Sequence, residues 1–267
     1  MKIRVAAMEN VYFLRPALSW EQRCAGIAAA GFDHVYAVPY PLRDDDFPRL
    51  RNLGDAPSRH GLRVSALYAN LDLAEPPHAP GAVRLRRLFE ETEGAPRIEL
   101  SVKCSTPCAW PRPLEDVVRA AVMPLWEIAA RRGLALALYP HSFYPLESLA
   151  QTRSVLARVG KPGPGFVFPL SHVFAVQPFE RALAELAACA AEVASVNVCG
   201  CRRLGPVPSK SQHVPLDEGD ASFASVAAVL RGSGFTGELI VQGHGWGGDP
   251  EEYLRRSRAA VRAHLQA

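Results

Sequence analysis

Residues 213–253 read HVPLDEGDASFASVAAVLRGSGFTGELIVQGHGWGGDPEEY, and the architecture predicted for the whole chain starts from this stretch. After a polar loop, apolar side chains between Phe223 and Leu230 recur at a spacing of three and four residues, which predicts a helix. Gly232 favours the end of this helix, because glycine tolerates the positive φ of a helix terminus. Residues 238–242 then form a short apolar run that is typical of a strand.

The residues after this predicted strand begin the last helix. Asp249 suits the N-cap position, and Pro250 suits the first helical position. His244 lies between two glycines in the connecting loop. The stretch is therefore a helix–strand–loop–helix unit with polar side chains gathered just past the strand.

The remainder of the chain repeats this alternation. The predicted strands span residues 3–7, 33–38, 62–69, 97–103, 134–139, 165–168, 193–198 and 239–242. Predicted helices upstream of the stretch span residues 19–30, 46–60, 80–93, 113–132, 146–159 and 179–191. Eight strands alternating with helices over about 250 residues are the size and rhythm of a (β/α)₈ TIM barrel. A doubly wound open sheet is the alternative, but no Gly-x-Gly-x-x-Gly follows a predicted strand. We therefore predict an α/β fold, a single TIM-barrel domain over residues 1–267.

Composition limits the classes of partner. The net charge of +3 is too small to favour nucleic acid, and no apolar run approaches the roughly 18 residues of a membrane span. We expect a cytoplasmic protein that binds a small molecule, and the sequence leaves open whether it is a homo-oligomer. The pairs Cys104–Cys108 and Cys199–Cys201 lack the usual spacing of zinc-binding thiolates, so reduced thiols packed as small hydrophobes are expected.

Polar side chains follow the predicted strands, at the end where TIM barrels carry their chemistry. Histidines follow three of these strands, at His141, His172 and His244. One such histidine is usually structural, but three at one rim favour a binding site. The other rim candidates are Glu9, Asn10, Tyr36, Tyr40, Tyr68, Asn70, Asp72, Lys103, Tyr139, Pro169, Asn197, Cys199, Arg202, Arg203 and Gln242.

Several segments resemble the sugar phosphate isomerase/epimerase group of the xylose isomerase-like TIM barrels. Residues 213–220, HVPLDEGD, with residues 234–241, GFTGELIV, are similar to the closing motif of that group, and residues 19–35 are similar to its first helix and second strand. His141 and His172 match histidines after its fifth and sixth strands. Arg203 lies six residues past Asn197, as a substrate-contacting Arg does past the metal His of the ketose epimerases.

The resemblance implies a divalent metal held by Glu, Asp, His and Glu after strands five to eight. Those positions here are Tyr139, Pro169, Asn197 (Cys199 if the register slips) and Gln242. Hard cations rely on carboxylate oxygens, so no metal is expected at this position and no cofactor is predicted. The proton-moving glutamates are lost as well. Gln242 cannot take a proton, and Tyr139 needs a phenol pKa lowered from about 10 to act as a base near neutrality.

The remaining groups leave alternatives open. The three histidines are acid–base groups, a displaced soft-metal site with Cys199, or only hydrogen-bonding groups. Lys103 is a base if it is buried and a solvated side chain otherwise. Arg202 and Arg203 either hold an anion or are solvated, while His213 is expected to shape its loop.

We therefore expect a metal-independent isomerase/epimerase-like enzyme that acts on a small sugar-like or cyclic carbonyl compound. His141, His172 and Tyr139 are the predicted catalytic residues, and the predicted substrate-binding residues are Gln242, His244, Asn197, Arg203 and Lys103. The alternatives are a catalytically silent barrel that binds a ligand or partner and, third, an enzyme that retains a metal. Rings at the presumed rim suit an uncharged, partly apolar ligand as readily as a sugar phosphate; they are Tyr12, Phe13, Tyr36, Tyr40, Tyr68, Trp110, Phe143, Tyr144 and Trp246.

Overall fold

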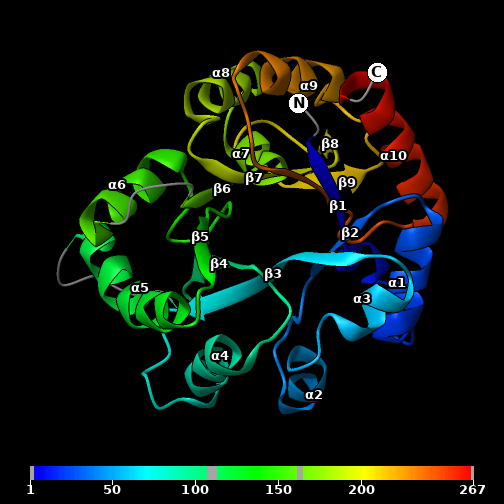
Figure 1. Ribbon diagram of the computed structural model, residues 1–267. Coiled ribbons are helices and arrows are strands. Elements are labelled where there is room, and N and C mark those ends of the chain that lie inside the picture. The colour runs from blue at the N-terminus through cyan, green and yellow to red at the C-terminus, as the bar shows by residue number, and fades with distance from the viewer. Residues whose placement is uncertain (1–2, 107–112, 161–164, 266–267) are drawn as a thin grey trace.

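Eight parallel strands close into a barrel in the computed structural model, which describes residues 3–106, 113–160 and 165–265. The barrel strands are β1 (Arg4–Met8), β2 (His34–Ala37), β3 (Arg63–Asp72), β4 (Arg97–Lys103), β5 (Ala135–Tyr139), β6 (Phe166–Pro169), β7 (Val193–Val198) and β10 (Glu238–Val241). Helices surround them on the outside (Figure 1). The predicted (β/α)₈ TIM barrel is confirmed.

The strand register brings the predicted rim residues to one end of the barrel. β1 closes the barrel against β10, with Arg4 opposite Glu238 and Ala7 opposite Val241. Pro169 on β6 is opposite Asn197 on β7. Because all eight strands run in the same direction, the residues that follow them share the carboxyl end.

Polar side chains cap several of the outer helices. The full set of described α-helices is α1 (Trp20–Ala29), α2 (Phe47–Leu50), α3 (Asp55–Arg59), α4 (Pro80–Glu91), α5 (Leu114–Arg131), α6 (Leu149–Val159), α7 (Leu170–Val176), α8 (Phe179–Cys189), α9 (Phe223–Gly232) and α10 (Pro250–Leu265). Ser19 and Ser148 form capping boxes with Gln22 and Gln151, which fix where α1 and α6 begin. Asp249 Oδ1 accepts from the Glu251 N–H at 3.1 Å, as the predicted start of α10 requires. None of the described helices is long and apolar enough to cross a membrane.

Several short elements depart from the prediction. The helix predicted over residues 46–60 is interrupted between α2 and α3. Gly54 weakens the helix there, and Pro57, in the first turn of α3, has no N–H to bond back to the preceding turn. Helix α7 follows β6 directly, in a stretch that we had not assigned to any element. An antiparallel hairpin of β8 (Gly200–Arg203) and β9 (Ser211–Val214) follows β7, so His213 lies in a strand and not in the predicted loop.

The barrel interior contains a buried group of charged side chains at the amino ends of the strands. We call Arg97, Glu99 and Glu238, with Tyr36 and Ser195, the amino-end cluster. Arg97 donates to Glu99 Oε1 at 3.0 Å and to Glu238 Oε2 at 2.9 Å. Tyr36 and Ser195 donate their hydroxyls to Glu99 at 2.8 and 2.6 Å. Arg4 also lies 3.2 Å from Glu238, so the two carboxylates are matched by two guanidinium groups, and the cluster is a structural filling of the barrel.

Candidate active site

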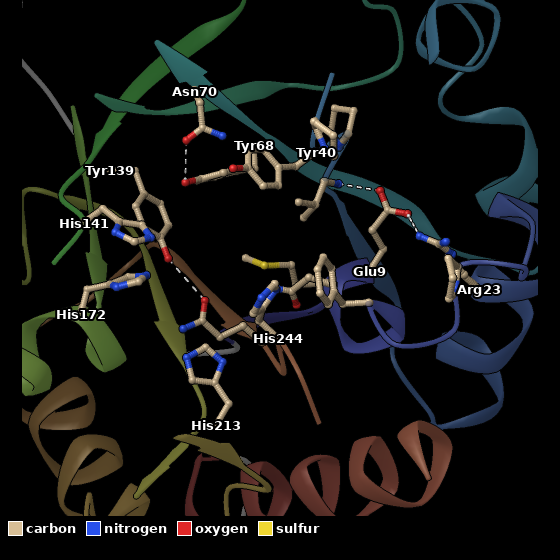
Figure 2. Close-up of a pocket in the computed structure, with 18 of the residues that line it drawn as sticks. Glu9, Arg23, Tyr40, Tyr68, Asn70, Tyr139, His141, His172, His213 and His244 are labelled. Atoms are coloured by element: carbon tan, nitrogen blue, oxygen red, sulfur yellow. Dashed lines mark hydrogen bonds and ion pairs between the residues drawn. The ribbon is translucent and has the colours of Figure 1, made fainter. Parts of the chain in front are cut away.

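A cavity of about 1070 Å³ opens at the carboxyl ends of the strands (Figure 2). Five of the eight predicted site residues line it: Tyr139, His141, His172, Gln242 and His244. They come from the ends of β5, β6 and β10, segments far apart in the chain. Its position matches that of active sites in TIM barrels, and its size suits a small-molecule ligand.

His141 and His172 form the most closely packed pair in this cavity. Their ring centroids lie 3.7 Å apart, and Tyr144 stacks on the other face of His141 at 3.9 Å. Ser142 joins the pair, since its carbonyl oxygen lies 2.9 Å from His141 Nδ1 and its hydroxyl lies 3.0 Å from His172 Nδ1. A carbonyl oxygen can only accept, so His141 carries its hydrogen on Nδ1 and a lone pair on Nε2.

Burial keeps both imidazoles neutral. Desolvation lowers the pKa of His141 to about 4 and the pKa of His172 well below its ordinary value of 6.5. Each imidazolium would also be repelled by the other histidines around the cavity. At neutral pH the pair therefore offers a neutral base and no positive charge.

Tyr139 and Gln242 meet beside the histidine pair. The Tyr139 hydroxyl donates to Gln242 Oε1 at 3.3 Å, and Gln242 Nε2 donates to Ser171 Oγ at 2.7 Å. Burial raises the pKa of Tyr139 well above 10, the opposite of what a phenolate base needs. Tyr139 is therefore a hydrogen-bond donor in this site.

The remaining predicted residues lie differently. His244 is on another wall, where its ring packs against Phe13 at a centroid distance of 4.2 Å. Asn197 lies buried and outside the lining of the cavity, with its Oδ1 accepting from Ser195 at 3.3 Å.

Neither predicted cation reaches the cavity lining. Lys103 lies 3.5 Å from Asp72, in a neighbouring pocket of about 170 Å³. Arg203 donates to the backbone carbonyls of Phe174 and Gln177 at 2.5 and 2.9 Å and lies over the Phe174 ring. The hairpin directs this arginine toward α7, a contact that residue spacing alone does not predict.

Two residues outside the predicted catalytic and substrate-binding sets also belong to the site: Glu9, which was a rim candidate without an assigned role, and His213. His213 lines the cavity, because β9 pairs with β8 in the register that places it opposite Cys201. Glu9 is 1% exposed at the cavity edge, where it accepts from the Val38 N–H at 2.6 Å and from Arg23 and Arg49 at 3.2 Å. An acidic residue at the end of the first strand was the only signal for Glu9, and no sequence pattern marked His213.

The four family metal positions fit a divalent cation poorly. Tyr139 keeps its phenolic proton, Pro169 has no ligating atom, and the amides of Asn197 and Gln242 are neutral. Among residues 3–106, 113–160 and 165–265, no group of three or more His, Cys, Asp or Glu side chains is arranged to hold an ion. The metal-free state stays a prediction. Cys108 and Trp110, named in our sequence predictions, lie outside the described residues.

Comparison with known families matches residues 24–264 to the family described as xylose isomerase-like TIM barrel. The chain belongs to this family. The match covers most of the barrel and confirms the resemblance inferred from the sequence motifs.

Solved structures of xylose isomerase-like barrels share the fold at low identity. A xylose isomerase domain protein from Salmonella typhimurium LT2 is 16% identical with a TM-score of 0.74, covering 98% of each chain. An L-ribulose 3-epimerase is 17% identical with a TM-score of 0.72, covering 99% of this chain and 95% of its own. The 3-keto-D-glucoside 4-epimerase of E. coli is 17% identical with a TM-score of 0.68, covering 98% and 100%. No protein of curated function matches the sequence.

Proposed function

We propose that this xylose isomerase-like barrel is an isomerase/epimerase-like enzyme that moves a proton next to the carbonyl of a small sugar-like or cyclic compound, without a divalent metal. The observation that carries the proposal is the His141–Ser142–His172 unit, whose neutral imidazoles lie at the cavity wall. Sugar epimerases among the structural neighbours support the reaction class.

The chemistry can be written with groups already present. His141 Nε2 removes the proton from the carbon beside the carbonyl, which leaves an enolate. The Tyr139 hydroxyl and a neighbouring amide hydrogen of Gln242 donate to the enolate oxygen in place of a metal ion. The negative charge that develops on this oxygen raises the pKa of the nearby imidazolium, which helps His141 to hold the proton.

Return of the proton decides the product. Delivery to the same carbon from the other face inverts it. Delivery to the former carbonyl carbon isomerises the compound, provided that the hydroxyl hydrogen on the first carbon passes to the former carbonyl oxygen, so that the first carbon becomes the new carbonyl. His172 packs on His141 and shares Ser142 with it, so the two imidazoles lie on one side of the substrate, which supports return of the proton to the former carbonyl carbon. The Ser142 hydroxyl can donate to His172 Nδ1 or accept from it, so both tautomers of His172 remain hydrogen-bonded.

The cavity suits an uncharged substrate that has an apolar part. Glu9 pairs with Arg23 and Arg49, and Asp46 lies 3.7 Å from Arg49 as well, so these two cations along the wall already face two carboxylates. Around the mouth, Phe13, Tyr40 and Phe143 are 48, 49 and 57% exposed. Aromatic faces of this kind pack against the C–H faces of sugars and other rings.

The test is solvent exchange. Keto sugars, keto glycosides and keto cyclitols are incubated with the protein in D₂O, and deuterium next to the carbonyl is followed by NMR. We expect exchange with at least one class, and a loss of about a hundredfold or more for His141→Gln, in keeping with general base catalysis. His78→Ala, an exposed histidine away from the cavity lining, is the matched control. Exchange at the wild-type rate in a folded His141→Gln protein would overturn the role of His141.

Ligand binding without turnover is the second candidate, favoured by the loss of every carboxylate from the family metal positions. It predicts that a compound from the same panel raises the melting temperature while no deuterium enters it. Metal analysis of untagged protein tests the third candidate, an enzyme that retains a metal. Stoichiometric Mn, Co, Fe or Zn that is lost on chelation would contradict a metal-independent reaction.

A further inference from the structure

Two buried cysteines lie in contact where β7 passes into the hairpin. Cys199 and Cys201 flank Gly200 and are 1 and 0% exposed. Their Sγ atoms are 3.3 Å apart and share a hydrogen bond. Their side chains point to the same side because residues two apart in an extended segment do so. A disulfide needs the sulfurs to approach to about 2.05 Å, a small movement from this starting point.

The surrounding backbone holds the two thiols together. Gly200 lies so close to the carbonyl oxygens of Pro215 and Glu218 that a side chain there would clash. Gly219, with φ of +94°, packs against the backbone of Cys201. The Cys-Gly-Cys segment is therefore confined on the side opposite the thiols, and the sulfurs have little freedom to separate.

His213 completes the group. It is the residue opposite Cys201 in the antiparallel hairpin register, so the two side chains lie on the same face of the hairpin. It also lines the cavity, as does Gln242. A small solute in the cavity thus lies one side chain away from a sulfur that is itself in contact with a second sulfur.

We propose that Cys199 and Cys201 are a redox-active dithiol that hydrogen peroxide closes to a disulfide, with His213 as the proton donor. The proposal does not depend on the proposed catalysis. It rests on the contact between the sulfurs, their confinement, and the histidine that connects them to the cavity.

The other buried cysteines show what is particular to this pair. Burial raises the pKa of Cys24 to about 12 and that of Cys189 to about 11, so both stay protonated. Cys199 and Cys201 differ from them in geometry, because their sulfurs lie 3.3 Å apart and His213 is opposite Cys201 in the hairpin. The thiolate is the form of cysteine that attacks peroxide.

The reaction balances with peroxide as the only oxidant. The Cys199 thiolate attacks one oxygen, the O–O bond breaks, and the His213 imidazolium protonates the departing hydroxide, which gives Cys199 sulfenic acid and water. The Cys201 thiol then attacks the Cys199 sulfur, its proton passes through His213 to the departing hydroxyl, and a second water leaves. The two thiols lose two electrons and two hydrogens, and peroxide is reduced to two waters.

The experiment uses the full-length protein treated with hydrogen peroxide and analysed by intact mass and peptide mapping. We expect the loss of two hydrogen masses within the peptide that carries Cys199 and Cys201, reversed by dithiothreitol. Glutathione disulfide should react at least about tenfold more slowly, because neither sulfur is accessible to a bulky reagent. Cys189→Ser, which removes another buried thiol, should behave as wild type.

Two substitutions separate the steps. Cys201→Ser should stop at a Cys199 sulfenic acid that dimedone traps, and His213→Asn should slow disulfide formation about tenfold, with folding checked by circular dichroism. Wild-type protein that keeps both thiols, or that passes to a sulfinic acid without losing two hydrogens, would overturn the proposal. An unchanged rate of disulfide formation in His213→Asn would show that His213 is not the proton donor.

Discussion

The two ends of the barrel interior contain polar side chains of different character. At the amino ends, Arg97 lies between two glutamates, and each contact is 3.0 Å or shorter. At the carboxyl ends, beside the charged Glu9 group at the cavity edge, lie a phenol, two amides and the His141–His172 pair, which burial keeps neutral, and the bond from Tyr139 to Gln242 is 3.3 Å long. The Asn197 Nδ2 has no hydrogen-bond partner among the described residues.

This difference separates structural polarity from functional polarity. A buried charge is tolerated where its partners are built into the fold, as they are in the amino-end cluster. At the carboxyl end, Tyr139 and Gln242 are joined by a longer bond of 3.3 Å, and they face a cavity. Such groups leave hydrogen bonds for a ligand to complete.

The largest expected effect comes from breaking the amino-end cluster. Arg97→Met leaves Glu99 and Glu238 buried without their shared cation, and we expect a loss of about 3–5 kcal/mol in the free energy of unfolding. Urea denaturation measures it. Arg86→Met, which removes an exposed helical pair with Glu90, is the control and should cost less than about 1 kcal/mol. Equal losses in the two variants would remove the distinction between the cluster and a surface ion pair.

A charge placed at the carboxyl end should lower the free energy of unfolding by less than the loss of Arg97 does, and the size of this loss should depend on pH. Gln242→Glu replaces the amide donor to Ser171 Oγ by an acceptor and buries a carboxylate, for which we expect a loss of about 2 kcal/mol in the free energy of unfolding at pH 8. Burial raises the folded-state pKa of a carboxyl, so the loss should fade as pH falls through that pKa.

Denaturation at two pH values tests this, with the exposed Gln212→Glu as control. The same samples test the metal position. Mn²⁺ should leave the melting temperature of the wild type unchanged, and a rise that chelation reverses would contradict the comparison between the two ends.

Removing an amide from the carboxyl end should have a small effect on stability. Asn197→Leu keeps the size of the side chain, loses the 3.3 Å bond from Ser195, and removes the partnerless Nδ2. Losing the bond lowers stability and removing an unpaired buried amide raises it, so we expect the free energy of unfolding to change by no more than about 1 kcal/mol. A loss of about 3 kcal/mol or more, the range for a broken buried network, would show that the carboxyl end is as structural as the amino end.

The smallest expected effect is that of pH on the rate of deuterium exchange. A base with a pKa of about 4 stays deprotonated well below neutrality, so the exchange rate at low substrate concentration should fall less than about twofold between pH 7 and 5.5. An unperturbed histidine, with a pKa of about 6.5, would lose most of its activity over that range. A decline centred near 6.5 would mean that His141 is not the base or that it is more hydrated than its packing implies.

The barrel could be predicted because its signals are local. Apolar runs bounded by glycines or polar residues placed β4 and β7 at their observed bounds, and Ser19 and Asp249 marked helix starts. Parallel strands then bring the residues at their carboxyl ends to one rim, which is why the histidines could be grouped in advance.

The features that could not be predicted depend on contacts between distant segments. The low pKa of His141 arises from burial, which spacing does not report, and Arg203 is bound by carbonyls of α7, which the alternation of elements gave no reason to expect. Strands β8 and β9 have four residues each, too few for a period-two pattern to stand out.

The pairing of β8 with β9 also restricts how this part of the chain can evolve. His213 lies directly opposite Cys201, and neighbouring residues of a strand point to opposite faces. A single insertion or deletion that slides the two strands by one position would turn the imidazole of His213 from the cavity to solvent. Insertions or deletions between residues 204 and 210 are therefore tolerated only where they change the loop that connects β8 and β9 and leave the pairing register of the two strands unchanged.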